Sequence, residues 1–130
     1  MRRQLRVYEG WALAVAVLVA LAATVQGQST PVKLTPDQAK NHAGEYATVA
    51  GRVFGVHTTR SNTTFLNFGA PFPRNTFLAV VFSSDAGKFQ DLSRLDGATV
   101  QVIGVIKLYQ GKPEIVLKSA SQLRVLRGAN

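Results

Sequence analysis

Short runs of β-branched and aromatic residues, separated by glycine-rich and polar breaks, dominate the chain from residue 45 to residue 118. Runs of this composition, bounded by Gly, Pro, Asn and Ser, are typical of β-strands. In the first run Val49, Gly51 and Val53 alternate with other residues and should share one face, and Gly51 and Gly55 indicate a bend or bulge. The pattern predicts five strands, over residues 45–57, 65–69, 76–82, 98–109 and 113–118.

Two segments interrupt this pattern and carry helix signals. Residues 35–44 begin with Thr35, a favourable N-cap, continue with Pro36, and end at Gly44, which can take a left-handed backbone conformation. Residues 83–97 have apolar side chains at helical spacing. We therefore expect one short helix before the first strand and another between the third and fourth strands.

The N-terminal segment is expected to lie outside the folded domain. It carries Arg2, Arg3 and Arg6, followed by 15 mostly apolar residues at positions 11–25. That run spans about 22 Å as a helix, which is short for a bilayer core of about 30 Å. We interpret residues 1–27 as a secretory signal peptide, which implies export to the periplasm or the extracellular space. The alternative is an uncleaved segment that anchors the protein in a membrane.

Residues 28–130 would then form a single basic domain. They contain 12 Lys and Arg against 6 Asp and Glu, a net charge of +6. The absence of cysteine excludes disulfides, thiolate metal sites and a cysteine nucleophile. The two histidines, His42 and His57, are far apart in the sequence, so no metal site and no cofactor are expected.

The order of elements resembles a known fold. A small open sheet would leave exposed edges, which closure into a barrel removes. The chain resembles the OB fold, the oligonucleotide/oligosaccharide-binding barrel, and looks like a small exported bacterial domain of the tRNA-anticodon/helicase type. The resemblance implies a mainly β, five-stranded barrel. It rests on VAGRV (49–53), FLNFG (65–69), TFLAVVF (76–82), LDGATVQVIGVI (95–106) and YQGKPEIVL (109–117).

The resemblance also implies a binding face around the second and third strands, flanked by loops at residues 58–64 and 110–112. Gly111 is expected to supply a positive φ in the second loop. Single-stranded nucleic acid is bound by aromatic rings that stack on bases and by cations that meet phosphates. Phe54 and Phe65 could equally belong to the core. The candidate binding residues are Arg52, Phe54, His57, Arg60, Phe65, Asn67, Arg74, Lys107, Tyr109 and Lys112.

The carboxylates do not predict an enzyme. Metal-dependent phosphodiester cleavage on such a barrel needs clustered carboxylates and arginines. Of the six carboxylates in residues 28–130, Asp37 and Glu45 flank the first expected helix and Glu114 lies within the last expected strand; the six form no converging set, and no Ser-His-Asp arrangement is evident. Two binding hypotheses remain: an exported module for single-stranded nucleic acid with little sequence preference, and an envelope module that binds protein or glycan. The fold does not decide between them.

Overall fold

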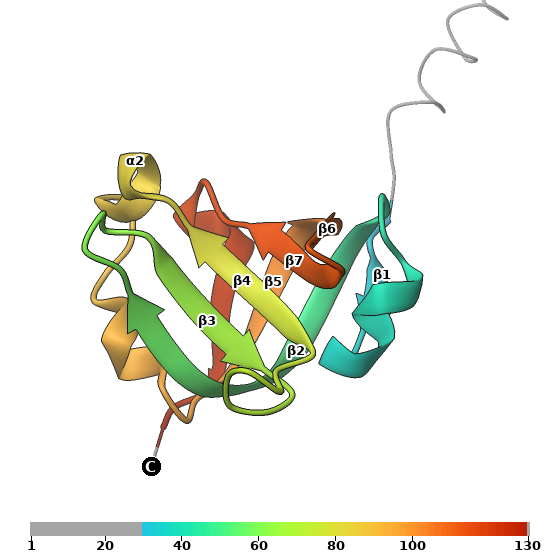
Figure 1. Ribbon diagram of the computed structural model, residues 1–130, viewed down its shortest axis with the longest axis horizontal. Coiled ribbons are helices and arrows are strands. Elements are labelled where there is room, and N and C mark those ends of the chain that lie inside the picture. Colours follow the sequence, from blue (N-terminus) through green and yellow to red (C-terminus); the bar gives the residue numbers. More distant parts are fainter. Residues whose placement is uncertain (1–29, 130) are drawn as a thin grey trace, which may run out of the picture. The chain divides into compact units, whose positions relative to one another are not determined.

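The computed structural model describes residues 30–129 of the chain. The expected signal peptide at residues 1–27 lies outside these residues. Within the described part no helix has the length and apolar character needed to cross a bilayer. The described chain is mainly β, as expected, with a few short helices around a strongly curved sheet (Figure 1).

One mixed sheet runs through the described residues. Its hydrogen-bonded order is β6-β7-β4-β3-β2-β5-β8, and β1 pairs with β2. Neighbouring strands are antiparallel except for the parallel pairs β1–β2 and β4–β7. The strands are β1 (Val32–Leu34), β2 (Tyr46–Thr58), β3 (Thr64–Phe68), β4 (Phe77–Val81), β5 (Thr99–Val105), β6 (Lys107–Tyr109), β7 (Lys112–Val116) and β8 (Leu123–Arg127).

The expected count of five strands is wrong, because the described chain forms eight. The run expected at residues 98–109 divides at Ile106, whose N–H donates to the carbonyl of Glu45 and whose carbonyl accepts from the N–H of Gly44. On one side of Ile106, β5 pairs with β2, whereas on the other side β6 pairs with β7. The short strands β1 and β8 add to the sheet at β2 and β5.

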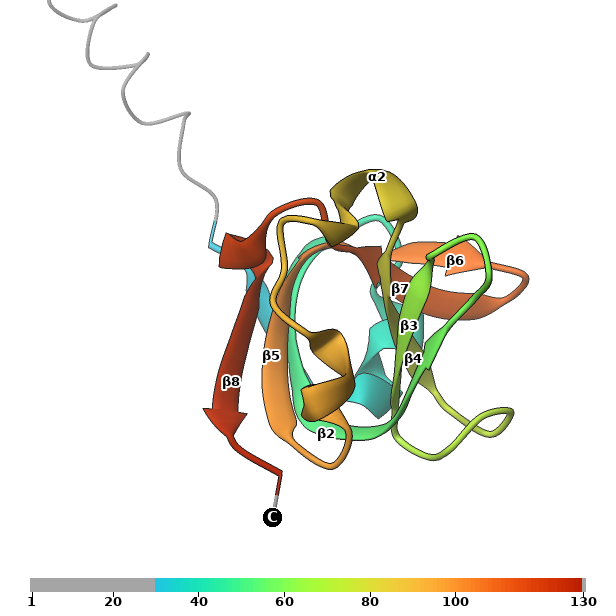
Figure 2. The ribbon, with the colours of Figure 1, turned by 90° about the vertical axis from the view of Figure 1, so that its left-hand side faces the viewer.

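The sheet curls back on itself, because β5 and β6 lie near opposite ends of its order but are adjacent in the chain. Figure 2 shows β2 and β5 on one side and β3, β4 and β7 on the other. Gly104 permits β5 to lie close to β7, since a Cβ at this position would lie only 2.7 Å from Cγ2 of Ile115 on β7. The bulge predicted in the first strand lies at Gly55, where the β2–β3 register shifts between Val53 and Val56.

The core fills the inside of this curved sheet. The predicted alternation in the first strand is confirmed at Val49 and Val53, which are fully buried. Phe68 on β3 and Phe77 on β4 meet edge to face, with ring centroids 5.4 Å apart. Apolar residues of β3, β4, β5 and β7, and of the chain next to β5 and β7, converge on the same interior; further fully buried members of this core are Leu66, Val81, Val100, Val102, Ile106, Ile115 and Leu117.

The helical segments are shorter than expected. The first is a 3₁₀ helix, η1 (Pro36–Asn41), with Thr35 at its N-cap and Gly44 at a positive φ of 87° just beyond it. One short helix was expected within residues 83–97, and the structure has two short helical elements there. They are α2 (Ser83–Ala86) and the 3₁₀ helix η2 (Leu92–Leu95).

The break between α2 and η2 has a local cause. The Asp91 carboxylate accepts hydrogen bonds from the backbone N–H and the hydroxyl of Ser93, which begins a new turn instead of continuing α2. The same two bonds hold the pKa of Asp91 below its ordinary value. Leu95 of η2 is buried and Phe89 packs against the core, so the segment still covers apolar surface.

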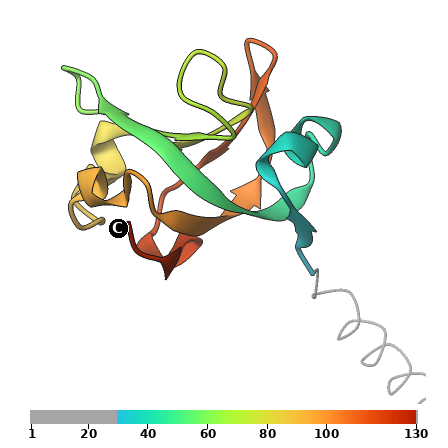
Figure 3. The ribbon, with the colours of Figure 1, turned by 90° about the horizontal axis from the view of Figure 1, so that it is seen from below.

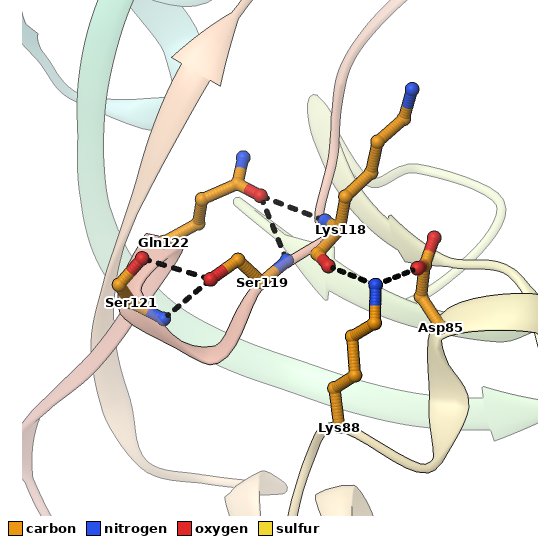
Figure 4. Close-up of polar contacts among 6 residues, drawn as sticks. All are labelled: Asp85, Lys88, Lys118, Ser119, Ser121 and Gln122. Atoms are coloured by element: carbon orange, nitrogen blue, oxygen red, sulfur yellow. Dashed lines mark hydrogen bonds and ion pairs between the residues drawn. The ribbon is translucent and has the colours of Figure 1, made fainter.

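A polar network holds the chain between β7 and β8 (Figure 4). The Gln122 side chain, in the 3₁₀ helix η3 (Ala120–Gln122), accepts from the backbone N–H groups of Lys118 and Ser119. Lys88 joins this region to α2, because its ammonium donates to Asp85 at 2.7 Å and to the Lys118 carbonyl at 3.1 Å. These hydrogen bonds therefore hold the chain that follows β7 in place, and they occupy the Lys88 ammonium.

Candidate functional site

A groove of about 720 Å³ lies on the outer face of β3, β4 and β7. The β2–β3 loop, the β3–β4 loop and the β6–β7 turn project on the same side of the molecule (Figure 3). Gln110 and Gly111 form that turn with positive φ values of 50° and 79°, so the expected role of Gly111 is confirmed. The groove is lined by His57, Phe65, Asn67, Phe72, Leu78, Tyr109, Gln110, Lys112 and Glu114.

Strand register builds the floor of the groove. Asn67 on β3 is paired with Leu78 on β4, Leu78 with Glu114 on β7, and Glu114 with Lys107 on β6. Phe65, two residues before Asn67, points to the same face and is paired with His57 on β2. Residues from five strands therefore form one surface, since side chains in register on adjacent strands are neighbours.

The groove is rich in aromatic surface. Phe65 is half-buried on the floor, whereas Phe72 in the β3–β4 loop and Tyr109 on β6 are 73% and 62% exposed. Phe65 therefore points away from the interior that contains Phe68. The sequence left open whether the Phe65 ring belongs to the core or to the binding face. The structure places it on the outer face of the sheet.

Five of the ten candidate residues come together in the groove: His57, Phe65, Asn67, Tyr109 and Lys112. Lys107 lies beside it, opposite Glu114.

The other four candidates lie outside the groove lining. Arg60 and Arg74 are exposed in the β2–β3 and β3–β4 loops. Arg52 and Phe54 lie on β2 near the bulge, where the Arg52 guanidinium is 5.3 Å from the centroid of the Phe54 ring. This pair forms a separate exposed contact, and the register shift between Val53 and Val56 lies between it and His57.

Two polar side chains of the groove are already engaged within the protein. Asn67 is buried; its amide donates to the Gly55 carbonyl at 3.4 Å and its oxygen accepts from the Asn75 amide at 3.0 Å. Lys112 donates to Asn75 Oδ1 at 2.6 Å and to the Pro73 carbonyl at 3.2 Å. These groups shape the groove and have fewer free donors and acceptors for a ligand.

Glu114 is one of four groove residues that the sequence did not predict; the others are Phe72, Leu78 and Gln110. The residue exposure of Glu114 is only 8%, and among residues 30–129 no hydrogen bond or ion pair involves its carboxylate. Burial raises the pKa of Glu114, while the Lys107 charge opposes the shift. Strand alternation could have located this residue, because Ile115 and Leu117 face inward and Glu114 must then face the opposite side.

Glu114→Gln should remove a pH dependence of stability. Because the folded-state pKa is raised, the carboxyl group is neutral in the folded protein and charged in the unfolded chain between the two pKa values. Stability should therefore fall as pH rises from about 4.3, the ordinary value, through the folded-state pKa. Urea unfolding of the wild-type protein and of Glu114→Gln across this range checks the expectation. A stability difference between the two proteins that does not change with pH would contradict it.

The described residues do not bring metal ligands together. Between residues 30 and 129 no three His, Cys, Asp or Glu side chains gather at a possible metal site. The groove instead offers aromatic rings on which a ligand can stack and the desolvated carboxylate of Glu114, and cationic loops lie beside it.

Comparison with known proteins identifies the fold. No protein-family model and no curated protein sequence matches the chain. Aspartyl-tRNA synthetase from Entamoeba histolytica matches 81% of the chain with a TM-score of 0.54 and 17% identity. An OBody, AM2EP06, in complex with hen egg-white lysozyme matches 78% with a TM-score of 0.52 and 13% identity. The fold is of the OB type.

The synthetases and the OBody differ in the share of their own length that this chain covers. Asparaginyl-tRNA synthetase from Pyrococcus horikoshii, with a TM-score of 0.51 and 18% identity over 75% of the chain, is covered over 24% of its own length. The Entamoeba enzyme is also covered over 24%, whereas the OBody is covered over 100%. The OB domain described here thus spans about a quarter of these synthetases.

Proposed function

We propose that this OB domain is a non-catalytic module that binds single-stranded nucleic acid along the β3–β4–β7 groove with little sequence preference. The observation that carries the proposal is the gathering of Phe65, Phe72 and Tyr109 around one groove. Every base has an aromatic face, so such rings bind single strands largely independently of sequence.

Cationic side chains around the groove support a polyanionic ligand. Arg60 and Arg74 project from the two loops beside it, and Lys107 is exposed at its edge. Among residues 30–129 none of these three forms a salt bridge. Their charges can therefore neutralise phosphates while the bases stack on the rings.

The structural neighbours favour nucleic acid among the ligands of this fold. Two of them are aminoacyl-tRNA synthetases, enzymes named for a nucleic acid substrate. The sequence resemblance to OB domains of the tRNA-anticodon/helicase type agrees with this ligand class.

Salt dependence tests the proposal. Neutralising three to five phosphates should give a log–log slope of affinity against salt of about −2 to −3.5 for a single strand. Arg60→Ala or Arg74→Ala should flatten that slope by about 0.7 each and weaken DNA and RNA oligonucleotides of all sequences alike. Fluorescence anisotropy with labelled oligonucleotides in a salt series measures both effects.

Arg94→Ala is the matched control for these variants. Arg94 lies on η2, where its guanidinium donates to Gln90, away from the groove lining. The substitution removes the same charge and should leave the slope unchanged. Failure of the wild-type protein to bind any oligonucleotide at low salt would reject the proposal.

A protein-binding module is the second candidate function. The specific observation in its favour is the OBody neighbour, which is bound to lysozyme and is matched over its whole length. An apolar groove with aromatic rims also suits a protein surface. Absence of oligonucleotide binding, together with a saturable protein ligand that Phe65→Ala weakens, would favour this alternative.

A further inference from the structure

The β3–β4 loop forms one wall of the groove and is held by a residue from another strand. Lys112 begins β7, and its ammonium donates to Asn75 Oδ1 at 2.6 Å and to the Pro73 carbonyl at 3.2 Å, both in the loop. The same ammonium lies 5.8 Å from the centroid of the Phe72 ring. One cation thus makes three contacts with a loop that lies far from it in the sequence.

The contact continues beneath the groove. Asn75, 3% exposed, donates from its amide to Asn67 Oδ1, and Asn67 donates to the carbonyl of Gly55 at the β2 bulge. A chain of hydrogen bonds therefore links β7, the β3–β4 loop, β3 and β2. Every member is shielded from water to some degree, so the loss of one leaves a buried polar group without a partner.

We propose that Lys112 is a positioning residue, which holds the β3–β4 loop and the Phe72 ring at the groove edge and does not contact phosphate. The role in ligand binding rests on the proposed nucleic acid function, but the role in holding the loop does not. It replaces the expectation from sequence that Lys112 meets phosphate directly.

Donor geometry supports this assignment. An ammonium has three N–H donors, and two of those of Lys112 are directed into the loop. A phosphate ligand would have to compete with the acceptors at Pro73 and Asn75. Lys107, on the paired strand β6, makes no side-chain hydrogen bond within the described residues and its ammonium is free to meet a phosphate.

Trypsin cleavage after Arg74 tests the loop without any ligand. Arg74 is exposed in the same loop, between the two residues that accept from Lys112. Native-state cleavage follows the population of open loop when opening is fast. Lys112→Met should raise the cleavage rate at Arg74 by about tenfold, as expected for the loss of one or two hydrogen bonds to a charged group. Cleavage after Arg60, in the β2–β3 loop, is the internal reference.

Lys107→Met is the matched control, because it makes the same change on the neighbouring strand. It should leave cleavage after Arg74 as in the wild type. In the oligonucleotide assay it should flatten the salt slope by about 0.7, whereas Lys112→Met should weaken binding with the slope unchanged. Asn75→Ala breaks the same contact without altering charge and should weaken binding as Lys112→Met does. Denaturant unfolding of each variant checks that the domain remains folded.

The outcomes separate the two proposals. If Lys112→Met flattens the slope by about 0.7 and leaves cleavage after Arg74 unchanged, Lys112 is a phosphate contact and the positioning role is overturned. If no oligonucleotide binds the wild-type protein but cleavage after Arg74 still rises in Lys112→Met, the proposed function fails and the loop-holding role stands. If cleavage rises equally in Lys107→Met, the effect is not specific to Lys112 and the proposal is rejected.

Discussion

Phe68→Ala is expected to lower the free energy of unfolding by about 3–5 kcal/mol, the usual cost of removing a buried phenylalanine side chain. Phe68 is fully buried between β2 and β4 and meets Phe77 edge to face at 5.4 Å. Its removal takes apolar surface away from the interior, eliminates this aromatic pair and leaves a cavity that a closely packed core fills poorly.

Urea or guanidinium unfolding of the purified domain measures the effect. Phe72→Ala is the control, because its ring is 73% exposed and its truncation should change stability by about 0.5 kcal/mol or less. A Phe68→Ala domain as stable as the wild type would show that this ring does not lie in the core.

Phe65→Ala is expected to reduce affinity for single-stranded oligonucleotides by about 1–3 kcal/mol, or about 5- to 150-fold. The ring lies on the groove floor in register with His57 on β2 and Val80 on β4, where a base can stack on it. Because the ring faces outward, the loss should appear in binding and only weakly in stability. Anisotropy titration and a denaturant melt of the same variant measure the two quantities.

Phe54→Ala is the matched control for Phe65→Ala. Its ring is also partly exposed, at 37%, but it lies with Arg52 outside the groove lining. Its removal should leave affinity unchanged. A Phe65→Ala domain that loses several kcal/mol of stability while retaining affinity would instead assign this ring to the core.

Features set by local chemistry were predictable from the sequence. Alternation identified Val49 and Val53 as inward residues, and Ile115 and Leu117 likewise proved buried. Gly111 takes the positive φ that a tight turn requires. These features depend on neighbours within a few residues, which a single sequence displays directly.

Local sequence patterns failed to predict the structure where two structural tendencies of the same segment competed. Apolar spacing over residues 83–97 favoured one helix, but the Asp91 side chain bonds to Ser93 and starts a separate turn. Residues 98–109 looked like one strand, because their composition does not reveal that β5 pairs with β2 while β6 pairs with β7. The choice of partner depends on segments distant in sequence.

The sequence by itself determined the mainly β character, the inward face of the first strand at Val49 and Val53, and the basic, aromatic composition from which a groove could be made. Tertiary structure alone decided that Phe65, Phe72 and Tyr109 share a groove with Glu114, and that Arg52 and Phe54 do not. The tertiary structure also places the Lys112 ammonium within hydrogen-bond distance of the Pro73 carbonyl and Asn75 Oδ1. The physical reason is that strand register and the curl of the sheet place side chains from distant segments side by side, and a bulge of one residue redirects all that follow.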